Sequence, residues 1–88
     1  MSIIAAGAGY SLGHPPSDPA RVRALIASAL DALSAYLDPG DERDARGYLA
    51  RGQLHVAWEL LWKVVEEERW TAPQELVAAG DAMGYEVR

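Results

Sequence analysis

Residues 52–66 read Gly-Gln-Leu-His-Val-Ala-Trp-Glu-Leu-Leu-Trp-Lys-Val-Val-Glu, and this stretch predicts the fold more clearly than any other part of the chain. Apolar residues recur three and four positions apart, which is the spacing of one face of an α-helix. Glycine at position 52 suits the left-handed backbone that ends a preceding helix. We therefore predict an amphipathic helix from about Gln53 to Arg69. Its buried stripe comprises Leu54, Ala57, Trp58, Leu61, Val64 and Val65, with Trp62 at the edge.

A second long helix is predicted on the N-terminal side, from about Pro19 to Leu37. Asp18 (or Ser17) supplies a capping oxygen, and proline fits the first turn. The stripe that this helix buries is Val22, Leu25, Ile26, Ala29, Leu30, Leu33 and Leu37. The opposite face carries mostly small residues, which fits either alanine-rich sequence bias or a surface that another chain or the N-terminal arm covers. These residues are Ala24, Ala27, Ser28, Asp31 and Ala35.

Two shorter helices are predicted beside the long ones. The Asp-Pro-Gly turn at 38–40 leads into a helix that Asp41 caps and that ends near Arg51. Its inner face is predicted to be Ala45, Tyr48 and Leu49. Thr71 and Gln74 match a capping box for the last helix, and Gly84 ends it. Its stripe is Leu76, Ala79, Gly80 and Met83, in which the glycine would allow close packing against a tryptophan.

Four helices with short connections predict an all-α fold, a small antiparallel bundle. The chain has 88 residues, which is enough for one domain only. We place this domain at 19–88. Residues 1–18 are rich in glycine and proline and are predicted to form an irregular arm, with a strand-like piece near 2–6.

Composition and charge restrict the function. Residues 38–88 hold eleven acids and six bases, so the whole net charge of −5 lies there. A negative surface repels phosphate backbones, which argues against nucleic-acid binding and suits a basic protein partner. Cysteine is absent, which excludes disulfides and thiolate metal sites. The first basic residue is Arg21 and no apolar run is long enough for a membrane span, so we expect a cytoplasmic protein without a secretory signal.

Two local motifs suggest chemistry, but their context argues against it. Gly9 to Gly13 matches the Gly-x-Ser-x-Gly elbow of hydrolases, with Ser11 as the nucleophile and His14 next to it. That elbow requires a strand-to-helix turn above a parallel sheet, but Pro15 and Pro16 forbid an immediate helix and no later strands are predicted. His55 and Glu59 lie one helical turn apart, but two protein ligands make a weak metal site. We expect no catalytic activity, no cofactor and no bound metal.

Partner contacts are expected on the acidic C-terminal half. A tryptophan among carboxylates, as at Trp62, is typical of an interface anchor. The acid-rich second helix would supply further contacts. The predicted contact residues are Asp41, Glu42, Asp44, His55, Glu59, Trp62, Lys63, Glu66 and Glu67.

The pattern Gly-Gln-x-x-x-Ala-x-Glu-x-Leu at 52–61, followed by Glu66, resembles the signature helix of the MafI-like bacterial immunity proteins. The resemblance covers roughly Val22 to Met83 and is strongest from Tyr48 to Glu66. It differs at Gln53, where the family usually has glutamate, and in the added arm of residues 1–18. No contact residue of the family is therefore transferred to this chain.

The resemblance implies a protein that binds a cognate polymorphic toxin and protects the cell that produces it. We expect stoichiometric binding to the toxin domain, without direct contact to nucleic acid or membrane. The alternative is a small helical adaptor or oligomerisation domain outside toxin systems. An adjacent gene for a large toxin with a variable final domain would distinguish the two.

Overall fold

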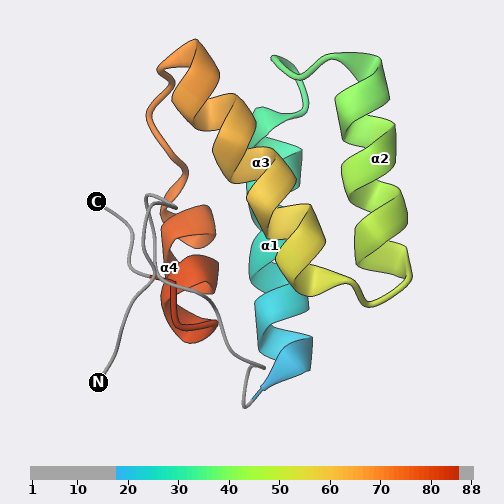
Figure 1. The fold of residues 1–88 in the computed structure, drawn as a ribbon, viewed down its shortest axis with the longest axis vertical. Coiled ribbons are helices and arrows are strands. Elements are labelled where there is room, and N and C mark those ends of the chain that lie inside the picture. Colours follow the sequence, from blue (N-terminus) through green and yellow to red (C-terminus); the bar gives the residue numbers. More distant parts are fainter. Residues whose placement is uncertain (1–17, 86–88) are drawn as a thin grey trace, which may run out of the picture.

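A computed structural model of the protein describes residues 18–85. Within this range the chain forms four helices and no strand: α1 (Pro19–Leu33), α2 (Pro39–Ala50), α3 (Leu54–Glu68) and α4 (Gln74–Ala82). Successive helices run antiparallel, with α2 and α4 on opposite sides of the central pair α1 and α3 (Figure 1). The predicted all-α bundle is confirmed. The predicted arm of residues 1–18, with the predicted strand-like piece near 2–6, lies outside the described residues except for Asp18.

The first two helices both begin at an Asp-Pro pair. Asp18 accepts a hydrogen bond from the backbone nitrogen of Arg21 at 3.2 Å, as predicted for a cap. In α2, Asp38 caps in the same way and accepts from the nitrogen of Gly40 at 3.0 Å. The prediction that Asp41 caps α2 is therefore wrong, because Asp38 already provides the capping oxygen. Asp41 lies in the first turn, where its negative charge interacts favourably with the positive end of the helix dipole.

Helix α1 ends at Leu33, earlier than the predicted Leu37. Residues 34–36 form a turn, and Leu37 still packs into the core. The residue before a proline is restricted to extended backbone, so the chain must leave the helix before Asp38. The turn to the antiparallel α2 takes the remaining residues. Burial of Leu37 was predicted correctly, although its helical conformation was not.

The ends of α2 and α4 follow the prediction, whereas the start of α4 does not. Gly52 and Gly84 have φ angles of 76° and 83°, the left-handed conformation that glycine adopts without strain. Helix α4 begins at Gln74, with Pro73 at the cap and no side-chain cap hydrogen bond. The predicted capping box with Thr71 is wrong, because that motif places the glutamine in the third helical position, not the first.

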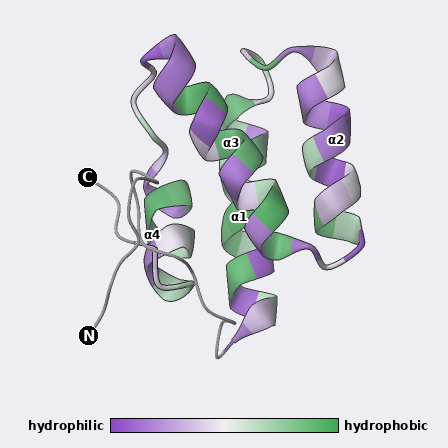
Figure 2. Ribbon diagram, viewed as in Figure 1, coloured by the Kyte–Doolittle hydropathy of each residue, from purple (hydrophilic) through white to green (hydrophobic). Residues whose placement is uncertain are grey.

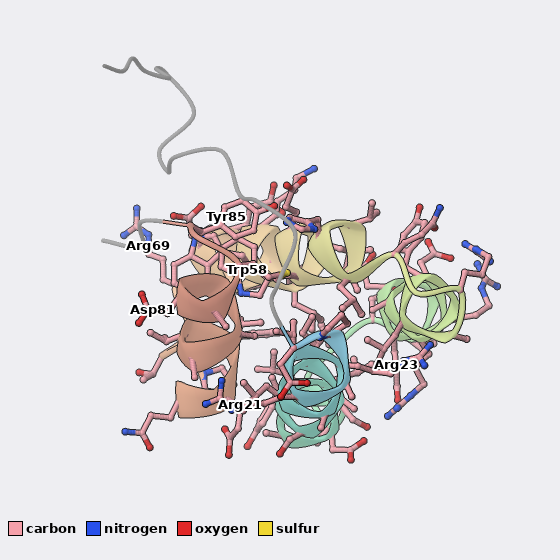
Figure 3. The ribbon with its side chains drawn as sticks, turned by 90° about the horizontal axis from the view of Figure 1, so that it is seen from below. Arg21, Arg23, Trp58, Arg69, Asp81 and Tyr85 are labelled. Atoms are coloured by element: carbon pink, nitrogen blue, oxygen red, sulfur yellow. The ribbon has the colours of Figure 1, made fainter. Side chains whose placement is uncertain are left out.

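The core is built around Trp58, which is fully buried as predicted. Its indole nitrogen donates to the carbonyl oxygen of Leu76 at 2.8 Å. Its ring lies against Gly80, where an added Cβ would be 2.6 Å from Cζ2, so the predicted close packing is confirmed. Figure 3 shows Trp58 and Tyr85 together between α3 and α4. The two rings are stacked, with centroids 4.3 Å apart.

Arg23 connects α1 to the C-terminal end of α2 (Figure 3). Its guanidinium donates to the carbonyl oxygens of Leu49, at 2.5 and 3.2 Å, and of Ala50, at 3.1 Å. The last carbonyls of a helix have no partner within the helix, so an arginine donor satisfies them. This contact holds the α2 end next to the start of α3.

Candidate functional site

A hollow of about 460 Å³ lies over the outer face of α3. One lining residue comes from α2 and the others from α3. They are Tyr48, Val56, Glu59, Leu60, Trp62, Lys63 and Glu66. Leu60 and Trp62 occupy opposite flanks of α3, because two residues turn a helix by about 200°. The hollow therefore crosses the outer side of the helix and reaches the buried stripe only at Trp62.

The lining divides into an apolar strip and an acidic strip. Val56 and Leu60 are four residues apart, so they lie on one face of α3, on the flank where Tyr48 of α2 joins them. Val56 is 43% exposed although it is aliphatic. Glu59 and Glu66 are seven residues apart and form a second row beside the first. Both glutamates are exposed.

Glu59 is held by a residue that the sequence prediction did not include. The hydroxyl of Tyr85, just after α4, donates to Oε2 of Glu59 at 2.5 Å. The Tyr85 ring also meets His55 edge-on, with centroids 5.6 Å apart. Although Glu59 and Lys63 lie one helical turn apart, they form no ion pair within the described residues. The carboxylate has turned toward α4 instead.

Trp62 is only 8% exposed, so the expectation of a half-exposed tryptophan at the edge of the stripe is wrong. Its ring stacks on Trp58 at 5.3 Å with only 6° between the planes. Stacking places most of the indole under the outer face of α3. Because Trp62 still lines the hollow, it serves as part of the floor and does not project from the surface.

The acidic residues of α2 are separate from this hollow. Arg46 donates to Asp31 and to Glu42, both at 3.0 Å, and these hydrogen bonds, that to Asp31 first, raise the pKa of Arg46. Asp44 lies 3.6 Å from Arg43 in an exposed pair. Neighbouring arginines thus offset part of the negative charge of α2. Hydrophilic residues are frequent along α2 and in the last turn of α3 (Figure 2).

The predicted contact residues are therefore brought together only in part. Four of them line the hollow: Glu59, Trp62, Lys63 and Glu66. His55 is half-buried beside Tyr85, and Glu67 is exposed outside the lining. The α2 residues Asp41, Glu42 and Asp44 do not line it. Whether any of these residues binds a partner stays a prediction.

Sequence reasoning missed Tyr85, but a local signal for it was present. When a helix ends in a left-handed glycine, the next residue often packs back on the last turn. Gly84 is such a glycine, and the nitrogen of Tyr85 bonds to the carbonyl oxygen of Gly80 at 2.9 Å. Tyr48 was predicted as an inner residue of α2, and Val56 and Leu60 were not singled out.

The described residues present no group of three or more His, Cys, Asp or Glu side chains that could hold a metal ion. The elbow motif with Ser11 and His14 lies outside residues 18–85. None of the four helices is long and apolar enough to cross a membrane. The chemistry that the hollow offers is thus apolar contact beside negative charge.

No protein-family model matches the chain, and neither a curated protein nor a solved structure is significantly similar to it.

Proposed function

We propose that the protein is an immunity protein, which binds a cognate bacterial polymorphic toxin in a stoichiometric complex and neutralises it. The observation that carries the proposal is the hollow on α3. The helix with the Gly52–Glu66 pattern also presents an apolar strip beside two carboxylates. Inhibition by contact requires an accessible surface with specific shape and charge, and no reacting group.

The charge of the chain supports a basic partner. Its net charge is −5, and Glu59 and Glu66 stand at the rim of the hollow. Complementary charge accelerates association and suppresses wrong partners. A nuclease toxin would present such a basic surface, because its substrate groove binds phosphates.

A second candidate is a helical adaptor or oligomerisation domain, and one observation favours it. Tyr36 is 70% exposed and lies 6.0 Å from the ring of Trp70, on a different part of the surface from the hollow. Exposed aromatic residues are frequent in contacts between proteins.

The test is co-expression with the product of the gene adjacent to the coding sequence, where that gene encodes a toxin. The immunity proposal predicts that cells survive toxin expression only with this chain, and that the two proteins co-purify in a fixed ratio. The proposal is refuted if cells survive toxin expression without this chain, or if the toxin does not co-purify with it. A chain that then forms oligomers with itself in light scattering would support the adaptor.

A further inference from the structure

The two strips of the hollow define the kind of side chains that could fill it. Tyr48, Val56 and Leu60 give one flank of α3 an apolar surface that the rest of the bundle does not cover completely. Burying exposed apolar area is favourable at about 25 cal/mol per Å². The strip therefore fits an aliphatic or aromatic side chain of a partner.

The second strip fits a cation. Two glutamates and Lys63 give the lining one net negative charge. Within the described residues neither Lys63 nor Glu66 takes part in an ion pair. Glu59 accepts from Tyr85 at Oε2, and its Oε1 accepts no hydrogen bond from residues 18–85. Both carboxylates can therefore accept hydrogen bonds from a lysine or an arginine.

We propose that the hollow binds a partner segment with an apolar side chain next to a basic one. The apolar side chain lies on Tyr48, Val56 and Leu60, and the basic group bonds to Glu59 and Glu66. The occupant is a segment of a basic protein, because the two carboxylates and the apolar strip lie on the same outer face of α3. This inference rests on the proposed function, since it describes how the toxin would be held.

Tyr85 is a positioning residue in this arrangement. An exposed glutamate samples several rotamers, and fixing it costs entropy when a partner binds. The hydroxyl of Tyr85 fixes the Glu59 carboxylate beforehand. Its ring is itself fixed by stacking on Trp58. The hydroxyl thus improves binding of a cation without touching the partner.

The occupant can be tested with a designed peptide and nuclear magnetic resonance. The probe is a blocked, alanine-rich peptide of about fifteen residues, long enough to become helical, with leucines on one face and arginines on the next. We expect saturable shifts of the Val56 and Glu59 amides and the Trp62 indole. An analogue with glutamate for arginine, or alanine for leucine, should give much smaller shifts.

Three results would overturn the proposal. The first is a set of shifts centred away from the hollow, or no shifts at all. The second is equal binding of the glutamate analogue. The third is a change of the same amides on simple dilution of the protein, because this would assign the hollow to a second copy of the chain.

Variants test the part played by Glu59 and Tyr85. Glu59→Gln should weaken the arginine peptide about two- to fivefold, as expected for an exposed ion pair. Glu68→Gln is the matched control, because it removes the same charge from an exposed residue of α3 that does not line the hollow, and it should leave affinity unchanged. Equal losses in the two variants would show that only net charge matters and would refute a specific cation site.

Tyr85→Phe retains the stacked ring and removes only the hydroxyl. It should weaken the arginine peptide about twofold, leave an otherwise identical glutamine peptide unaffected, and have no further effect in the Glu59→Gln background. A purely structural role of Tyr85 would weaken both peptides, and that result would overturn its positioning role.

Failure of this inference can be distinguished from failure of the proposed function. A toxin that is neutralised equally by the Glu59→Gln protein, with its footprint elsewhere, would leave the immunity function standing and refute the hollow. If the hollow binds the arginine peptide but the chain fails to protect cells, the binding site stands and the immunity function is refuted.

Discussion

Trp58 and Trp62 lie one turn apart on the buried face of α3 and stack on each other, yet only Trp62 also lines the hollow. Trp58 is fully enclosed, with its indole nitrogen bonded to Leu76 and its ring against Gly80. Trp62 lines a hollow whose other lining residues are exposed or half-buried. Packing within the chain accounts for the inner face completely. On the outer face of α3 it accounts only for Glu59, which the Tyr85 hydroxyl holds.

This difference separates stability from binding. Changes on the inner face should lower the free energy of unfolding, because the core has no spare volume. Changes on the outer face should leave that free energy nearly unchanged and alter partner binding alone. The following predictions test this division, from the largest expected effect to the smallest.

Trp58→Ala should lower the free energy of unfolding by about 3–5 kcal/mol, because it leaves a buried cavity and removes the hydrogen bond from the indole to the Leu76 carbonyl oxygen. Chemical denaturation of the purified chain measures this. Trp62→Ala is the comparison, and it should cost less, since its void opens into the hollow and fills with water. Equal costs for the two variants would contradict the contrast between the enclosed Trp58 and Trp62, which lines the hollow.

Gly80→Ala should lower the free energy of unfolding by about 1–3 kcal/mol through overpacking. The new Cβ would lie 2.6 Å from a Trp58 ring that is held by a hydrogen bond and two stacks. Gly47→Ala is the matched control, because the nearest atom to its Cβ is 3.6 Å away. This control should raise the free energy of unfolding by about 0.5–1 kcal/mol. If Gly80→Ala raised the free energy of unfolding, the Trp58 ring would have to move to make room for the new Cβ.

Arg69→Gly should raise the free energy of unfolding by about 0.5–1 kcal/mol. Arg69 ends α3 with a φ of 59°, a conformation that glycine adopts more easily than other residues. The change touches neither face of α3, so it should leave partner binding unaltered. A lower melting temperature would mean that the arginine side chain stabilises the fold by more than its backbone costs.

Glu59→Lys combined with Glu66→Lys should change the free energy of unfolding least, by roughly 0.5 kcal/mol or less, apart from the lost Tyr85 bond. Neutralisation of the toxin should nevertheless fall, because both carboxylates of the hollow are reversed. A growth assay with toxin, together with circular dichroism, separates these effects. Full protection by this variant would locate the interface elsewhere, and the exposed residues Ala24 and Ser28 of α1 and Ala35 of the following turn would be examined next.

Association with a basic toxin should also slow as salt is added. Long-range attraction is screened over about 8–10 Å at physiological ionic strength. Stopped-flow association rates at increasing salt measure the effect. An association rate independent of salt would argue that the net charge of −5 does not steer the partner.

Much of the fold could be read from the sequence, and the errors have local causes. The stripes of all four helices were predicted, with Leu25, Val64 and Tyr48 only half-buried. The Asp38–Pro39 pair was interpreted as a turn, although Asp18–Pro19 carries the same signal for a helix start. The candidate site was predicted less well, because helical spacing places Trp62 at an edge but does not show what covers that edge.

The sequence by itself determined where the helices lie and how two of them end. Apolar periodicity, Asp-Pro starts and the glycines at 52 and 84 act within a few residues, so no distant contact is needed to read them. Only the tertiary structure decided that Arg23 closes the end of α2 and that Tyr85 holds Glu59. Each of these contacts joins residues 26 positions apart. Their existence depends on how the helices pack, which side-chain spacing along one helix does not specify.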